Sequence, residues 1–388
     1  MTFGVLALIV LAGLAGPLLA FGRRSLVPVV VGEIFAGVVI GKSGFRWLDP
    51  AQPTTEFLAE VGFAMLMFAA GLSVPLRQPG LLSGLRRGAL AAFVAALLAV
   101  PFGFLASFAT STHHAAIYAL LLASGSAAVL LPAVQEHGLM DDRRALTVMA
   151  QVTIADIAAI VSVPLVLRPG HAARAALGGL AVAACVVLLY GVTRLLSGRP
   201  WIGQVRRWSK KRAWALDLRL SLLVLFGLAW VAESVGTSVL IAGFGVGLMV
   251  AAIGGPKRLS RQVTGVANGF MIPIFFVVLG ASIDLRSLVT QPILIALAAL
   301  LAACNAAVHL GAAMLTRQSL GAGLAATAQL GVPAAVVAVG FHEHVITSGQ
   351  GSAIVAAALV SLPMTAAGVT LLGRRAPRGQ PAATAAAT

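Results

Sequence analysis

Thirteen mostly apolar stretches, joined by short polar or basic loops, make up nearly all of this 388-residue chain. A helix needs about 20 largely apolar residues to cross the hydrocarbon core of a membrane. The predicted spans are 2–21, 26–41, 54–75, 88–109, 114–137, 144–167, 174–197, 214–233, 237–255, 264–283, 289–315, 318–342 and 350–373. Only 10% of the residues are charged and 59% are hydrophobic, whereas soluble domains carry about 25% and about 45–50%. The sequence therefore excludes a soluble enzyme and predicts an all-α polytopic membrane protein.

The basic residues lie almost entirely in loops on one side of the predicted membrane. If the N-terminus is outside, 21 of the 27 Lys and Arg residues fall in inner loops, seven of them between Arg194 and Arg212. Because basic loops stay cytoplasmic, we predict an outside N-terminus and a cytoplasmic C-terminus in a cell inner (plasma) membrane. Topology accounts for the net charge of +15, so we expect a lipid bilayer around the chain and no nucleic-acid partner. We expect the tail, 374–388, to be disordered and to leave no room for a further domain.

Three motifs recur in the same order at almost the same spacing. Gly71–Arg77 (GLSVPLR) matches Gly280–Arg286 (GASIDLR), and Gly32–Gly37 lies opposite Ala242–Gly247. The third match pairs residues 135–137 with 342–344. The matched helices are seven spans apart in chain order. Because successive spans cross the membrane in alternating directions and seven is odd, the two halves have opposite orientations. We predict two inverted-topology six-helix repeats, 1–167 and 214–373, joined by a linker helix at 174–197, as in secondary transporters.

Corresponding spans of the two repeats carry Gly and Pro at similar places. Ser124, Gly125, Ser126 and then Pro132 interrupt the span 114–137, and Thr327–Pro333, which includes Gln329, interrupts 318–342. Paired interruptions of this kind predict broken helices that cross near the membrane midplane. The alternative is that these small residues only let helices pack closely. We expect Ser124, Ser126 and Gln329 to support an ion site at the crossing.

Asp156 lies near the centre of the span 144–167, far from any basic residue in the sequence. An ionised carboxylate at the membrane centre costs roughly 2.5–3.5 kcal/mol on insertion scales, so such a residue is functional by default. A proton and a cation can compete for it, and this competition is the chemical basis of an exchanger. Thr153 shares its helix face and is a candidate ligand or hydrogen-bond partner. The alternative is a structural carboxyl bonded to a neighbouring helix.

The span 289–315 supplies Asn305 and His309, four residues apart and so on one helix face. Either could face Asp156, because the two spans belong to opposing repeats. Most other acidic residues lie at helix ends or in loops, and Glu33 falls in a shallow part of its span. Cys185 and Cys304 lie in apolar runs and make neither a metal site nor a disulfide framework.

These features resemble the bacterial monovalent cation:proton antiporter family, which has the sodium/proton exchanger-like fold. The resemblance rests on Gly32–Gly37, Phe68–Leu72, Ser124–Ser126, Asp156 and the run from Phe275 to Leu285. It implies a mobile core made of helices 4–6 and 11–13. It also implies a scaffold of helices 1–3 and 8–10, through which two copies form a homodimer, and it implies that Asp156 carries the ion and the proton.

Two positions depart from that family pattern. Ala155 precedes Asp156, where electrogenic members have a second aspartate, and Asn305 stands where members often have Lys or Arg. The departures agree with each other, because a buried base without its partner acid would be an uncompensated charge. With one carboxylate at membrane depth, we predict electroneutral exchange.

We therefore predict a secondary transporter, not an enzyme, that exchanges Na⁺ or K⁺ for H⁺ by alternating access. It would use no cofactor and no metal other than the transported cation. Two alternatives stay open. One is a K⁺ efflux system of the same fold, and the other is a non-transporting membrane protein that kept the fold for sensing or assembly.

Overall fold

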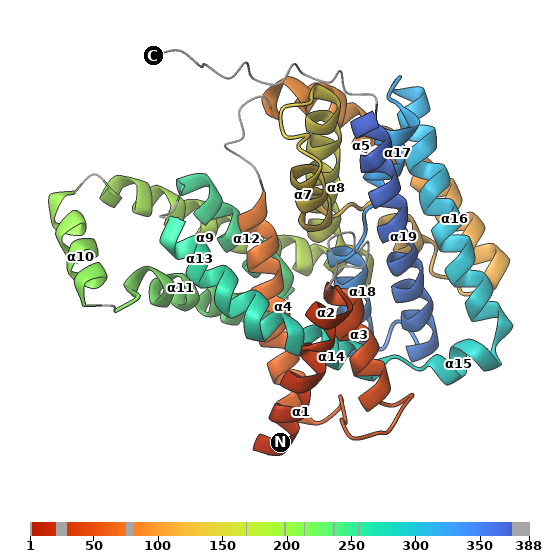
Figure 1. The fold of residues 1–388 in the computed structure, drawn as a ribbon, viewed down its shortest axis with the longest axis horizontal. Coiled ribbons are helices and arrows are strands. Elements are labelled where there is room, and N and C mark those ends of the chain that lie inside the picture. The colour runs from red at the N-terminus through yellow and green to blue at the C-terminus, as the bar shows by residue number, and fades with distance from the viewer. Residues whose placement is uncertain are drawn as a thin grey trace, which may run out of the picture.

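The computed structural model describes residues 2–20, 29–74, 81–167, 169–197, 199–212, 214–235, 237–254 and 257–374. Over these ranges the chain forms helices and no strands (Figure 1). The predicted tail falls almost wholly outside the described residues, and so do several basic loop residues used for the orientation. The all-α prediction is confirmed.

The helices follow the thirteen predicted spans closely. Short additional helices lie in the loops, namely η1 (Pro169–His171), α10 (Pro200–Lys211) and α15 (Leu285–Thr290). The spans are α1 (Phe3–Gly13) with α2 (Ala15–Leu19), α3 (Val29–Ile40), α4 (Pro53–Ser73), α5 (Leu81–Thr110), α6 (Ala115–Ala123) with α7 (Ala127–Glu136), α8 (Arg143–Leu167), α9 (Ala172–Ser197), α11 (Leu216–Ser234), α12 (Val239–Ile253), α13 (Lys257–Val266) with η2 (Ala267–Met271) and α14 (Ile272–Ser282), α16 (Pro292–Leu315), α17 (Leu320–Ala326) with α18 (Gly331–His342), and α19 (Ser348–Arg374).

Within the described part of the chain, nine helices, with each broken helix counted once, are long and apolar enough to cross a membrane. Three shorter apolar helices, Phe3–Leu19, Val29–Ile40 and Val239–Ile253, account for three more of the predicted spans. The remaining span, α11, has 19 residues and carries Asp217, Arg219 and Glu233 near its ends. The architecture is therefore consistent with about thirteen membrane helices.

The helices pack as two bundles (Figure 1). The scaffold bundle comprises α1–α4 and α11–α14, in which α4 packs along α12 and α3 along α14. The core bundle comprises α5–α8 and α16–α19, in which α5 contacts α6, α8 and α16, and α19 contacts α16 and α17. The linker helix α9 contacts α12, α11 and α8. This division follows the core and scaffold that the resemblance implied.

A pair of glycines brings α3 and α14 into backbone contact. A Cβ atom on Gly37 would overlap the carbonyl oxygen of Val277, and a Cβ atom on Gly280 would overlap that of Ile34. Each glycine therefore faces the carbonyl of the residue that lies three positions before the other glycine. Small residues at such positions allow the close helix packing on which membrane bundles depend.

A second pair repeats this arrangement between α4 and α12. A Cβ atom on Gly71 would overlap the carbonyl oxygen of Phe244, and one on Gly247 would overlap that of Phe68. The sequence matches equated Gly37 with Gly247 and Gly71 with Gly280, so the two contacts are equivalent under the repeat. The inverted repeat is thus confirmed at the level of residue contacts, while its boundaries at 1–167 and 214–373 stay a prediction.

Candidate functional site

The first break lies between α6 and α7, where the sequence predicted it. Ser124 (φ −75°, ψ 166°) and Ser126 (φ −144°, ψ 102°) are extended. The Ser124 hydroxyl donates to the Leu121 carbonyl at 2.7 Å. This carbonyl is one of those at the C-terminal end of α6 that have no intrahelical partner. Gly125 is needed here because a Cβ atom would lie 2.9 Å from Val152 Cγ1 on α8. The unwound segment therefore rests directly on the helix that carries Asp156.

The second break lies between α17 and α18. The Thr327 hydroxyl donates to the Leu324 carbonyl at 2.7 Å, as Ser124 does in the first break. The backbone N–H of Gln329 donates to Ser361 Oγ on α19 at 3.1 Å. α18 then begins at Gly331 with Pro333 in its first turn, where the missing N–H of proline costs no helical hydrogen bond.

Two amide side chains join the breaks to each other. Gln329 Nε2 donates to the Leu121 carbonyl at 2.6 Å and to Asn305 Oδ1 at 3.0 Å. Asn305 Nδ2 donates to the Thr327 carbonyl at 3.0 Å. The amides thus tie α16 to both broken helices and satisfy carbonyls that unwinding leaves without a helical donor.

Asp156 lies at the first break, with 5% of its surface exposed. Its Oδ2 accepts a hydrogen bond from the backbone N–H of Ala127, the first residue of α7, at 3.3 Å. The positive end of the α7 dipole therefore points at the carboxylate. Thr153, one turn earlier, is buried and its hydroxyl has no hydrogen-bond partner among the described residues. The carboxyl of Asp156 and the hydroxyl of Thr153 thus both lie beside the N-terminus of α7.

His309 is buried in α16, and its ring lies near the backbone of Leu122 and Ser124. Neither ring nitrogen makes a hydrogen bond of good geometry within the described structure. Asp156 bonds to Ala127, whereas Asn305 bonds to Thr327 and Gln329. Asn305 therefore stabilises the break between α17 and α18, a role that helix periodicity alone did not indicate.

Gln329→Ala is expected to lower the thermal stability of the purified protein. The change leaves buried Asn305 Oδ1 without its donor, which costs about 1–3 kcal/mol. It also removes one of the three donors to the Leu121 carbonyl, which keeps the N–H and the hydroxyl of Ser124. The measurement is the melting temperature in detergent. Gln291→Ala is the matched control, because Gln291 is exposed and its side chain does not cap α16. Equal melting temperatures for the two variants would contradict the amide bridge.

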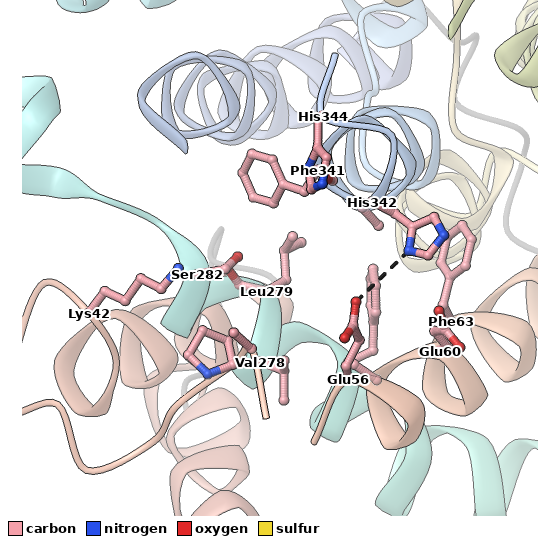
Figure 2. A pocket seen from close by; sticks show the side chains of 15 residues that line it. Lys42, Glu56, Glu60, Phe63, Val278, Leu279, Ser282, Phe341, His342 and His344 are labelled. Atoms are coloured by element: carbon pink, nitrogen blue, oxygen red, sulfur yellow. Dashed lines mark hydrogen bonds and ion pairs between the residues drawn. The ribbon is translucent and has the colours of Figure 1, made fainter. Parts of the chain in front are cut away.

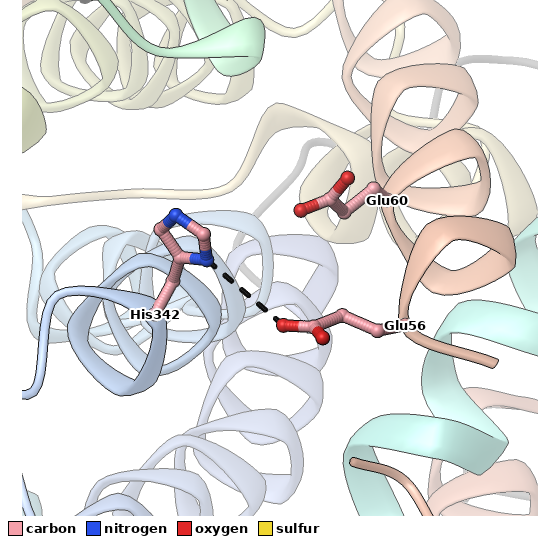
Figure 3. Close-up of side chains that lie close together, drawn as sticks. All are labelled: Glu56, Glu60 and His342. Atoms are coloured by element: carbon pink, nitrogen blue, oxygen red, sulfur yellow. Dashed lines mark ion pairs between the residues drawn. The ribbon is translucent and has the colours of Figure 1, made fainter. Parts of the chain in front are cut away.

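A hollow of about 420 Å³ separates α4 from α18 near the start of α4 (Figure 2). Glu56 and Glu60 of α4 and His342 of α18 point into it, and Glu56 Oε1 lies 3.9 Å from His342 Nδ1 (Figure 3). Ligand atoms of the three side chains lie within 4.8 Å of one another. All three side chains are exposed, so this contact between core and scaffold is weak, and we assign no metal cofactor to it.

Sequence reasoning placed Glu33 in a shallow part of its span, but the structure buries it. Glu33 of α3 is 3% exposed and lines a second cavity. The sequence feature that could have indicated this burial is the Gly32–Gly37 repeat motif, in which Glu33 directly follows Gly32. A Cβ atom added to Gly32 would overlap the backbone of α2. That close approach encloses the carboxyl.

Two inverted repeats with crossed broken helices define a membrane protein of the secondary-transporter class. Residues 6–373 match the family described as sodium/hydrogen exchanger, transmembrane. The chain belongs to this family. Because the family consists of transporters, the prediction that the chain is not an enzyme is confirmed.

Individual relatives are more distant. The chain is 24% identical over 382 residues to YjbQ of Bacillus subtilis, a candidate Na⁺/H⁺ antiporter, covering 92% of this chain and 61% of that protein. It is 24% identical over 303 residues to a Na⁺/H⁺ antiporter of Enterococcus hirae, covering 77% and 78%. It is 29% identical over 271 residues to the glutathione-regulated potassium-efflux protein KefC of Klebsiella pneumoniae, covering 68% and 42%.

Among solved structures, the sodium proton antiporter MjNhaP1 of Methanocaldococcus jannaschii has a similar fold. The TM-score is 0.66 at 17% identity, covering 96% of this chain and 97% of that one. At this identity the likeness concerns the fold alone. It agrees with the two-bundle architecture described above.

Proposed function

We propose that the chain is a secondary transporter that exchanges Na⁺ or K⁺ for H⁺ across the membrane. The observation that carries this proposal is Asp156, a buried carboxylate at the end of α7, within the fold of a transporter family. The names of the relatives support both ions, since one is a Na⁺/H⁺ antiporter and another a Na⁺/H⁺-K⁺ antiporter, GerN of Bacillus cereus. The KefC relative supports K⁺ efflux as the second candidate.

In this proposal Asp156 holds either a cation or a proton. The N-terminus of α7 stabilises the ionised carboxylate while a cation arrives, and Thr153 supplies a neutral oxygen. Carbonyls and hydroxyls of the break at Ser124 and Ser126 offer further oxygens of the kind that hard cations prefer. Asp156 belongs to the core bundle, so movement of the core along the scaffold would expose it to each side in turn.

The direct test is a proton-flux assay in everted membrane vesicles, with Na⁺, K⁺ and Li⁺ added in turn to a pH-sensitive dye. Exchange appears as dequenching of the dye when the cation enters and protons leave. The cation that gives the strongest response separates Na⁺ exchange from K⁺ efflux. No response to any of the three would favour a non-transporting membrane protein.

We expect exchange to be electroneutral, because Asp156 in the core carries one cation one way and one proton the other. Both loaded forms have the same charge, so a membrane potential does no net work on the cycle. Each net charge moved would instead contribute about 2.3 kcal/mol per 100 mV. The measurement is Na⁺/H⁺ exchange in proteoliposomes with the potential clamped by K⁺ and valinomycin. A rate or end-point that follows the potential would show a second translocated charge, and His309 would be the first residue to replace.

The assembly and orientation belong to the same proposal. We infer a homodimer through the scaffold bundle, as the resemblance to the antiporter family implies. The apolar side chains that α11 leaves exposed at Leu220, Leu223 and Trp230 suit contact with lipid or with a second copy. We also infer an outside N-terminus and a plasma-membrane location from the loop charges. In this orientation the hollow at Glu56 and Glu60 opens to the outside.

A further inference from the structure

A second cavity, of about 680 Å³, lies at the opposite end of α4 from the Glu56 hollow. Its walls come from both bundles. The scaffold contributes Glu33 of α3, Ser73 of α4 and Asn268 of η2, and the core contributes Leu131 and Pro132 of α7. By the proposed orientation, this is the cytoplasmic end. The cavity therefore lies where the two bundles would slide past each other.

Glu33 is the buried acidic side chain of this cavity. It is 3% exposed, and its Oε2 has no hydrogen-bond partner among the described residues. Burial of an ionised carboxylate is unfavourable where one of its oxygens has no donor. A proton on Oε2, or a cation that enters through the cavity, would therefore stabilise the group within the described part of the chain. Glu33 packs closely against α2, since a Cβ atom on Gly16 would lie 2.9 Å from Glu33 Cγ.

The other polar side chains that line the cavity offer oxygen atoms that can coordinate a cation. Ser73 and Thr264 supply hydroxyls, and Asn268 supplies an amide oxygen. Asn268 lies in the π-helical turn η2, which precedes Pro273. Pro273 has no N–H to donate to the preceding turn, which accounts for the local widening of the helix. Carboxylate, hydroxyl and amide oxygens together suit a hard cation.

The cavity also comes close to Asp156. Ala128, which lines it, follows Ala127, whose N–H donates to Asp156. Leu131 borders both this cavity and a small void lined by Ala127 and Thr153. Leu131 therefore lies between the Glu33 cavity and the void beside Thr153, which is too small to hold a water molecule.

We propose that Glu33 forms a recruiting site for the transported monovalent cation in the cytoplasmic cavity, one step before Asp156. This inference rests on the proposed function, which it deepens. Glu33 belongs to the scaffold bundle and does not travel with the core. It therefore raises the local cation concentration and the rate of loading of Asp156, and it leaves the stoichiometry of exchange unchanged.

The transport test compares Glu33→Gln and Glu33→Asp with the parent protein in everted vesicles, where the cytoplasmic face is accessible. For Glu33→Gln we expect the apparent KM for the cation to rise by on the order of tenfold, because charge focusing in clefts has effects of at least that size. The maximal rate should stay near that of the parent, and Glu33→Asp should recover part of the affinity. Glu56→Gln, at the opposite end of α4, is the matched control and should leave KM unchanged. An unchanged KM for Glu33→Gln would overturn the proposal.

A second readout does not depend on transport. Dicyclohexylcarbodiimide modifies protonated carboxyls in apolar surroundings, and mass spectrometry of the purified full-length protein locates the product. We expect modification of Glu33 that added Na⁺ or K⁺ suppresses and choline does not, and we expect the same result in an Asp156→Asn background. Modification that neither cation suppresses would overturn the recruiting site even in a protein that exchanges ions. Protection of Glu33 in a protein without exchange would instead overturn the proposed function alone.

Discussion

Asp156→Asn is expected to reduce exchange to the background of vesicles without the transporter. Asn is nearly isosteric with Asp, and its side-chain oxygen can still accept from the Ala127 N–H at the start of α7. It can neither release a proton nor balance the charge of a cation. The variant should therefore fold, insert and purify like the parent while losing the competition between ion and proton. Proton flux in everted vesicles, with Na⁺ and with K⁺, is the measurement.

Two further variants make this result specific. Asp141→Asn removes a carboxylate from the exposed loop before α8 and should leave both flux and melting temperature unchanged. Asp156→Glu keeps the charge but moves the carboxylate by about one C–C bond, so we expect partial activity with a shifted pH optimum. Full transport by Asp156→Asn would show that another group carries the ion, and the assignment of Asp156 would be wrong.

The sequence predicted the spans and the breaks because both depend on local properties. Apolar length predicts a membrane helix wherever it occurs. Gly and Pro in equivalent spans of a repeat predict unwinding. Gly125 lies in the first break, Ser124–Ser126, and Gly331 and Pro333 directly follow the second break, Thr327–Leu330, in the first turn of α18. Pro132 lies inside α7 and does not interrupt it. Asp156 was identifiable for a similar reason, since a charge in the centre of a long apolar helix stands out against its neighbours.

Other features depend on which helices meet, and no periodicity contains that information. Asn305 could have faced several neighbours, and only the packing of α16 against the broken helices directs it to Thr327 and Gln329. Glu33 is one turn from the start of α3, where an acid would ordinarily reach solvent. It is buried because Gly16 and Gly32 allow α2 and α3 to touch across it. The sequence therefore located the proposed ion site and named Asn305 and Gln329 as supporting residues. It indicated neither the hydrogen bonds that these amides make nor the burial of Glu33.

The repeat gives the scaffold two equivalent contacts between helices. Gly37 and Gly280 form one helix contact of the scaffold, and Gly247 and Gly71 form its symmetry equivalent. If the scaffold stays rigid while the core moves, these contacts hold together the part against which movement occurs. A defect in either contact should then affect assembly of the whole protein more than the chemistry at Asp156.

Gly280→Val is accordingly expected to prevent stable assembly. Its Cβ would overlap the Ile34 carbonyl, and a backbone carbonyl cannot move aside unless α3 and α14 separate. Overpacking costs about 1–3 kcal/mol where neighbours relax, so a contact between two rigid helices should reach or exceed the upper value. Fluorescence-detected size-exclusion chromatography of a fusion protein, with heating, measures both yield and melting temperature. Gly227→Val in α11 is the matched control, since a Cβ there meets nothing within 4 Å.

Because the repeat makes the contacts equivalent, Gly71→Val should lose as much stability as Gly280→Val. A large loss of stability for one variant and none for the other would mean that the two contacts contribute unequally to the stability of the scaffold, although the repeat makes them equivalent in geometry.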